Sequence, residues 1–253
     1  MSKYGKRWER TETLAAFNLY CKIPFSKVNK DNKKIVALAK KLDRTPSSLS
    51  MKMSNLAWHD PDNKSSLRRG SALDEEIWDA FFANPETIIC ESEEARAYFD
   101  GKETGEIAVA EDEIKIPELE ERQRVARVRV NQGFFHRSVL SSYDEKCCIT
   151  GLAAVEFLNA SHIIPWRENR NRLDPRNGLC LNALHDRAFD RGLMTILPDG
   201  EVVISKYLQK QASKCSESEI IADCAGKKIR MPHKFKPKKE FLEYHNKKIY
   251  KDG

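Results

Sequence analysis

Two histidines and one asparagine between residues 157 and 190 are the side chains whose types and spacing best suit chemistry. His162 lies in the mainly apolar run ASHIIPW, where the nearby proline favours a strand end over a helix. Asn177 comes fifteen residues later in an Asn-Gly turn, and His185 follows eight residues after that in the helical segment NALHDRAFD. A strand, a turn and a helix in this order predict a ββα unit in which the three side chains converge on one small site.

The elements around this unit predict a mixed α and β domain. The segment GFFHRSVLSSYDEK places Phe135, Val139 and Tyr143 on one face of a helix. Further along, LMTILPDGEVVIS contains two β-prone runs about a Pro-Asp-Gly turn. The last part of the chain is basic and includes an aromatic-bearing helix, KKEFLEYHNKKIY. We therefore expect an α+β domain over residues 122–253.

The N-terminal part of the chain predicts two short helices joined by a tight turn. Apolar residues from Ile35 to Leu42 recur at positions i, i+3, i+4 and i+7, which is one face of a helix. Thr45 is placed to cap a second helix, with Pro46 at its first position. Asp43 stands at the turn, where aspartate tolerates the left-handed conformation better than most residues. This pattern is typical of a helix-turn-helix.

The outer side of the second helix suggests contact with DNA. Its first turns carry small polar groups and a cation that suit phosphates and base edges, namely Ser47, Ser48 and Lys52. Helical hairpins of this kind also occur in proteins that never touch DNA, so a purely structural hairpin remains the alternative.

Charge is unevenly distributed along the 253 residues. The 44 Lys and Arg against 38 Asp and Glu give a formal net charge of +6. Residues 103–121 hold eight acids and one lysine, whereas the following RQRVARVRV holds four arginines and no acid. The acidic stretch has few large apolar side chains, which predicts a linker at residues 101–121. This linker would separate a helical domain at 1–100 from the second domain at 122–253.

The seven cysteines disfavour a disulfide framework, because their number is odd and their spacing is irregular. No CxxC pair occurs, so a structural zinc site is also disfavoured, although an irregular site built from Cys147, Cys148 and Cys180 remains an alternative. The start MSKYGKRWER is charged, and no apolar run approaches the roughly 18 residues that a membrane span needs. We therefore expect an unprocessed cytoplasmic protein without a membrane segment.

Taken together, these segments resemble the HNH, or ββα-metal, endonuclease family. The resemblance covers residues 122–205 and rests on QGFFHRSVLSSYDEKCCITG, ASHIIPW and NGLCLNALHDRAFDRGL, with FLEYHNKKIY near the C-terminus. They are similar to the zinc-free HNH domains of bacterial restriction endonucleases. The helical stretch from FNLYCKIPFSKVN to RTPSSLSMKMSNLAWHDP is similar to an N-terminal module attached to some of those proteins. The resemblance implies an α+β chain with a helix-turn-helix-like domain and a ββα-metal nuclease domain.

The resemblance also implies a role for each of the three site residues. Phosphodiester hydrolysis needs a base to deprotonate water, and neutral histidine titrates near working pH, so His162 is expected to be the general base. His185 is expected to bind a divalent metal ion that stabilises charge on the scissile phosphate and the leaving 3′ oxygen. Asn177 is expected to hydrogen-bond across the β loop and to fix the orientation of His162.

The residue before the expected base departs from the family pattern. Family members commonly carry a metal-binding Asp or His there, whereas this chain has Ser161. The expected metal site therefore consists of His185, Ser161 and a compensating carboxylate on the following helix, with Asp190 preferred to Asp186. The alternative is that the metal ion is held mostly through waters. The expected ion is Mg²⁺, with Mn²⁺ as the alternative. Three arginines are expected to bind flanking phosphates as bidentate donors: Arg129, Arg137 and Arg167.

We therefore expect a metal-dependent DNA endonuclease, acting in restriction or antiphage defence by family analogy. Because one ββα-metal site cuts one strand, cleavage of both strands requires a homodimer or two successive nicks. Two other functions remain as alternatives. One is a DNA-binding regulatory protein whose HNH fold has lost catalysis, for which Ser161 is the reason. The other is a nuclease that acts on RNA or structured nucleic acid.

Overall fold

The computed structural model describes five stretches of the chain: residues 5–61, 70–101, 119–167, 172–212 and 220–252. The chain divides into two compact units, Met1–Arg137 and Ser138–Gly253. This boundary lies within helix α6, Leu119–Ser142, whose side chains are described from Arg127 onward. Most of the expected linker at 101–121 lies outside the described residues. No described helix is long and apolar enough to cross a membrane.

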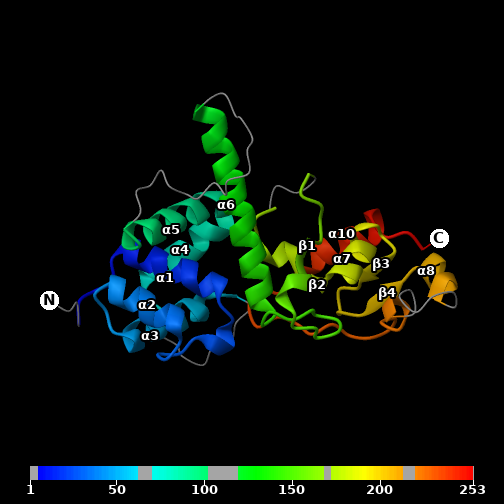
Figure 1. Ribbon diagram of the computed structural model, residues 1–253, viewed down its shortest axis with the longest axis horizontal. Helices are drawn as coiled ribbons and strands as arrows, with labels where there is room; N and C mark the ends of the chain where they lie inside the picture. Colours follow the sequence, from blue (N-terminus) through cyan, green and yellow to red (C-terminus); the bar gives the residue numbers. More distant parts are fainter. Residues whose placement is uncertain (1–4, 62–69, 102–118, 168–171, 213–219, 253) are drawn as a thin grey trace. The chain divides into compact units, whose positions relative to one another are not determined.

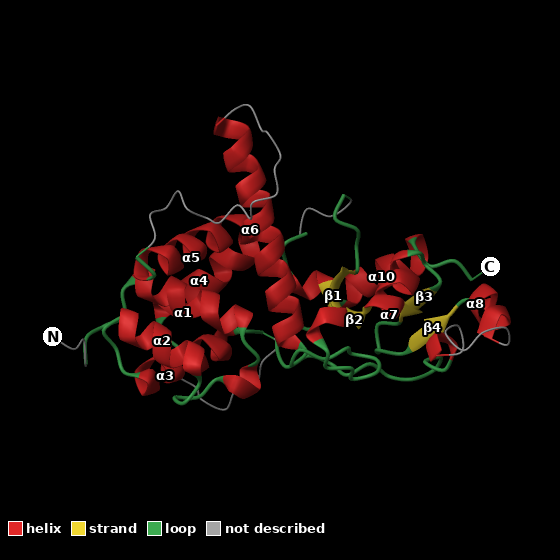
Figure 2. Cartoon of the chain, in the orientation of Figure 1, coloured by secondary structure: helices red, strands yellow, loops and turns green. Residues whose placement is uncertain are grey.

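Every described element of the first unit is helical (Figure 1 and Figure 2). Besides the start of α6, the elements are α1 Arg10–Lys22, a 3-10 turn Phe25–Lys27, α2 Lys33–Lys41, α3 Pro46–His59, α4 Ala72–Ala83 and α5 Pro85–Phe99. Helix α1 packs against α3, α4 and α5, and most of its residues are buried. Its Phe17 meets Trp78 and Phe81 of α4 edge to face, with ring centroids 5.0 and 5.2 Å apart. This aromatic cluster is the centre of the helical core.

Helices α2 and α3 form where the apolar spacing predicts them, joined by a tight turn. Asp43 occupies the turn with a φ of 57°, in the left-handed region. The Thr45 hydroxyl oxygen accepts a hydrogen bond from the Ser48 amide at 3.1 Å, and Pro46 takes the first helical position. The local sequence therefore sets where the second helix begins.

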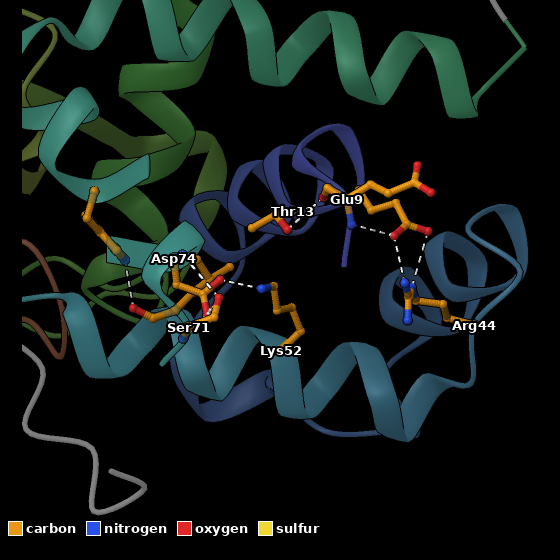
Figure 3. A network of polar contacts seen from close by, with 9 residues as sticks. Glu9, Thr13, Arg44, Lys52, Ser71 and Asp74 are labelled. Atoms are coloured by element: carbon orange, nitrogen blue, oxygen red, sulfur yellow. Dashed lines mark hydrogen bonds and ion pairs between the residues drawn. The ribbon is translucent and has the colours of Figure 1, made fainter. Parts of the chain in front are cut away.

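Buried ion pairs link α3 and its preceding turn to the other helices of this unit (Figure 3). The Lys52 side chain is 4% exposed, and its ammonium group pairs with Asp74 of α4. The guanidinium group of Arg44 pairs with the buried Glu12 carboxylate of α1 at 2.7 Å. The expectation that Lys52 contacts DNA is therefore corrected, because this side chain lies on the inner face of α3 beside the buried Met53. Removal of either partner would leave an uncompensated buried charge, so these pairs fix α3 in place.

The second unit contains two small antiparallel sheets and several helices. Its elements are β1 Leu158–His162, β2 Gly178–Asn182, α7 Ala183–Asp190, β3 Met194–Ile196, β4 Val202–Ile204, α8 Lys206–Ala212 and α10 Lys239–Lys248, with 3-10 turns at Val155–Phe157 and Pro175–Asn177. Strand β1 pairs with β2 in a register that sets His162 opposite Gly178, and β3 pairs with β4. Helix α7 packs against both β1 and β2. These three elements form the expected ββα unit.

Helix α10 fixes the end of α7 through a buried histidine. His245 stacks on Phe189 of α7, with ring centroids 3.7 Å apart. Its Nε2 lies 3.2 Å from the Phe189 carbonyl oxygen, and its Nδ1 lies 2.8 Å from the Thr195 hydroxyl. Because a carbonyl oxygen only accepts, Nε2 carries the proton and Nδ1 accepts from the hydroxyl. Burial lowers the pKa of His245 to about 4, so this ring is neutral and its role is structural.

Candidate active site

Asn177 closes the loop that follows strand β1. Its side chain is fully buried, and both of its polar atoms bind the backbone of one residue. The Oδ1 atom accepts from the Ile164 amide at 2.9 Å, and Nδ2 donates to the Ile164 carbonyl at 3.1 Å. The Asn177 carbonyl oxygen also accepts from the Ile163 amide at 2.9 Å. These bonds hold the end of β1, where His162 lies, against the start of β2.

His162 is a half-buried imidazole whose orientation is fixed by the backbone. Its Nε2 lies 3.0 Å from the Arg172 carbonyl oxygen. This oxygen only accepts, so Nε2 carries the proton in the neutral ring and the lone pair belongs to Nδ1. Burial lowers the pKa of His162, and the bond to the Arg172 carbonyl opposes this effect only in part. His162 is therefore neutral near pH 7, which is the form that a general base requires.

Asp186 of α7 is anchored to the strand that ends in His162. Its Oδ1 accepts a hydrogen bond from the Ser161 hydroxyl, and its Oδ2 accepts from Asn159 Nδ2 at 2.7 Å. Asn159 and Ser161 alternate along β1 and so lie on one face of the strand. A half-buried carboxylate is thereby held beside the residue that precedes His162.

His185 does not share the environment of Asp186, and its expected role as a metal ligand is corrected. The ring is fully buried, with Nδ1 4.0 Å from Cys147 Sγ and Nε2 3.4 Å from Cys224 Sγ. Burial alone would favour the neutral ring, but the two thiol contacts raise the pKa of His185 to about 9. Both ring nitrogens already face sulfur atoms. Since consecutive helical residues point about 100° apart, the inward turn of His185 directs Asp186 to β1.

Asp190 is exposed on α7, four residues after Asp186 and therefore on the same side of the helix. Desolvation by the surrounding protein and repulsion from the Asp186 carboxylate raise the pKa of Asp190 to about 6. A cation between two neighbouring carboxylates would relieve this repulsion. Among the residues that the structure describes, no three His, Cys, Asp or Glu side chains form a metal site by themselves.

The remaining expected site residues are dispersed. Arg129 and Arg137 are exposed on the part of α6 that belongs to the first unit, whereas Arg167 is exposed in the second. Ser47 is exposed and Ser48 is half-buried at the start of α3. The expected binding of phosphates by these five side chains therefore stays a prediction.

Two residues beside His162 are absent from the sequence-based site. The Trp166 ring meets the His162 ring edge to face, with centroids 5.5 Å apart, and the Arg172 guanidinium lies 5.0 Å from the Trp166 ring centre. Trp166 alone resembles a packing residue in the sequence. The signal that points to contact with nucleic acid is its setting among arginines, in the stretch WRENRNR.

Comparison with known families matches this part of the chain. A family model described as HNH endonuclease matches residues 147–197, a stretch that includes β1, β2, α7 and β3. No curated protein matches the chain. The second unit therefore contains an HNH family domain, whose family implies a nucleic acid substrate and a divalent metal ion.

The substitution Asn177→Asp tests the role of the buried carboxamide. A carboxylate in place of Nδ2 would face the Ile164 carbonyl oxygen, so two acceptors would meet in a buried place. We expect the free energy of unfolding to fall by about 2 kcal/mol or more, measured by urea denaturation at pH 7. The matched control is Asn182→Asp, because Asn182 caps α7 as an acceptor for the His185 amide and aspartate caps equally well. Equal losses in both variants would contradict this role of Asn177.

Proposed function

We propose that this protein is a metal-dependent endonuclease that hydrolyses phosphodiester bonds of DNA with His162 as the general base. The observation that supports this proposal most strongly is the state of the His162 ring. Its Nε2 is fixed on the Arg172 carbonyl, its pKa is lowered, and the residue before it holds the carboxylate of Asp186. A neutral imidazole held in a fixed tautomer is the form that activation of water at a phosphate requires.

In the proposed reaction, Nδ1 of His162 accepts a proton from the attacking water. The Arg172 carbonyl stabilises the resulting imidazolium ion, because the bond from Nε2 strengthens when the ring becomes charged. Asn177 keeps the end of β1 in register with β2, which holds the backbone that carries the imidazole in place. Asn159 and Ser161 keep the Asp186 carboxylate from rotating.

The oxygen atoms of Asp186, Asp190 and Ser161 fit a hard divalent cation, for which we propose Mg²⁺ with Mn²⁺ as a substitute. When bound, this ion supplies positive charge for the scissile phosphate and the leaving 3′ oxygen. Each Asp186 oxygen accepts one hydrogen bond from β1 and retains a further lone pair for a cation. Ser161 thus has a function as a donor to Asp186. This argues against the alternative in which Ser161 marks an HNH fold that has lost catalysis.

We also propose that the helical unit binds DNA through α2 and the start of α3. Three lysines on α2 are exposed and near the exposed Ser47 in the chain: Lys33, Lys34 and Lys40. Acidic side chains are instead concentrated on α4 and α5, where the exposed ones include Glu75, Glu76, Asp79, Glu86 and Glu94. A polyanion is attracted to the first surface and repelled by the second. This lysine surface replaces Lys52 in the sequence-based proposal.

Restriction or antiphage defence is the biological role that we propose by family analogy. One ββα-metal site cuts one strand, so a double-strand break requires a homodimer or two successive nicks. Cleavage of methylated and unmethylated plasmid, compared side by side, tests the proposal of restriction.

The substitution His162→Ala tests the proposed base. With supercoiled plasmid and Mg²⁺ or Mn²⁺, we expect the nicking rate to fall by at least about 100-fold, which is the contribution of a positioned base. In the unaltered protein the lowered pKa of His162 keeps its ring neutral at pH values below the ordinary histidine pKa. The rate should therefore stay near its maximum down to about pH 6.5 and fall only in more acidic solution.

The control for this experiment is His233→Ala, since His233 is an exposed histidine of the same unit. This variant should nick plasmid at the rate of the unaltered protein. Nicking by the His162→Ala variant at the full rate, with either metal, would exclude His162 as the base. RNA of matched sequence, offered in parallel, distinguishes a DNase from a nuclease that prefers RNA.

Simultaneous substitution of Lys33, Lys34 and Lys40 by alanine tests the lysine surface. Phosphate contacts release counterions, so the slope of log Kd against log salt should become shallower by up to about 0.9 for each lost contact. Fluorescence anisotropy with a DNA duplex in EDTA measures this slope. The triple arginine variant keeps the charges and should keep the slope. An unchanged slope in the alanine variant would assign the helical unit a role other than DNA binding.

A further inference from the structure

Trp166 and Arg172 form a stacked pair beside the proposed base. The Arg172 guanidinium carbon lies 5.0 Å from the centre of the Trp166 ring, within the range of a cation–π contact. The Trp166 ring also contacts the His162 ring edge to face, and the backbone of Arg172 binds His162 Nε2. Both residues thus contact the histidine that would activate water, Trp166 through its ring and Arg172 through its backbone.

The side chains of Trp166 and Arg172 lie at the surface and not in the core. Trp166 is half-buried, and Arg172 is exposed. Among the described residues, no carboxylate forms an ion pair with Arg172. By contrast, Arg44 pairs with Glu12 and Arg176 pairs with Asp174. An arginine that stays next to an indole ring without an acidic partner keeps its plane and its donors available for a ligand.

A planar cation on an indole ring is suited to an unstacked nucleobase. Bases that are not paired within a duplex stack on aromatic rings and on arginine planes, independently of their sequence. In an intact B-form duplex both faces of each base are covered by neighbouring base pairs, so such a platform has nothing to contact. The chemistry of the pair therefore selects a strand that is unpaired at the site.

We propose that the stacked pair of Trp166 and Arg172 is a platform for an unpaired base of the cut strand, next to the scissile phosphate. This inference rests on the proposed nuclease function and narrows its substrate class. The enzyme would cut DNA that is unpaired at the point of cleavage and would not cut an undistorted duplex. The platform lies against His162, so the base that stacks there places the adjoining phosphate near Nδ1.

The test measures binding of the full-length protein without metal, so that no cleavage occurs. The probes are a fluorescein-labelled oligothymidylate of 20 nucleotides and a labelled 20-base-pair duplex, each titrated in EDTA. For the Trp166→Ala variant we expect the Kd for the single strand to rise by about fivefold or more, which corresponds to the loss of one stacked base. The Kd for the duplex should change by less than about twofold, because the duplex offers no open base.

Two further variants separate stacking from charge and from general loss of structure. Arg172→Lys retains the positive charge but not the plane, so it should also weaken binding of the single strand selectively. Tyr207→Ala removes an aromatic side chain of the same unit that is 55% exposed and should leave both Kd values unchanged. The melting temperature of each variant, measured by circular dichroism, checks that the fold is retained.

Equal weakening of single-strand and duplex binding in Trp166→Ala, or no change in either, would overturn the platform. The plasmid-nicking assay with the unaltered protein and the His162→Ala variant, run beside this titration, separates failure of the platform from failure of the nuclease proposal. If that variant and the unaltered protein both fail to cut but still bind the single strand through Trp166, the nuclease proposal fails and the platform stands. If cutting depends on His162 but Trp166→Ala binds both probes normally, the platform fails alone.

Discussion

The pair of hydrogen bonds between the Asn177 carboxamide and the backbone of Ile164 is the constraint on which the rest of the site depends. These bonds are buried, so an unpaired amide or carbonyl there would cost about 1–3 kcal/mol. They join the segment after β1 to the residue before β2. The hairpin can therefore hold the proposed base, His162, at the end of a strand of only five residues. A short strand pair without such a bond would fray at the place where the chemistry needs it to be rigid.

The second constraint is the rotation of α7 about its own axis. Its inner face is occupied by His185 between two thiols and by Phe189 under the His245 ring. With these two contacts made, the helix presents Asp186 to β1. If α7 were rotated by one residue about its axis, Asp186 would take the buried place of His185. Its carboxylate would then be buried without a partner, which is strongly unfavourable. The core of the domain thus determines which side chain reaches the site.

The sequence predicts the local elements well where local chemistry decides them. The left-handed turn at Asp43, the cap at Thr45, strand β1 and helix α7 all follow from turn residues, caps and apolar spacing. The wrong predictions concern the direction in which a side chain points from its helix. Lys52 turns inward to Asp74, and His185 turns inward to thiols from Cys147 and Cys224. The partners in these contacts are 22, 38 and 39 residues away, so no pattern within one helix reveals them.

Trp166 is a third case, in which the residue type alone is ambiguous. An indole next to a strand usually packs in a core, and only the placement of Arg172 over the ring separates a platform from a core residue. The two residues are six positions apart in a segment without a helical or strand pattern, so their spacing in the sequence gives no signal of contact. Tertiary structure supplies that information.

The proposed metal site contains Asp186 and not His185, and binding of Mn²⁺ tests this assignment most directly. Free Mn²⁺ has an electron paramagnetic resonance signal that weakens on binding, so a titration gives a Kd without any turnover. We predict that Asp186→Asn raises this Kd by at least about tenfold, whereas His185→Gln lowers the melting temperature and leaves the Kd within about twofold. The reverse result, in which His185→Gln abolishes binding and Asp186→Asn retains it, would contradict the account.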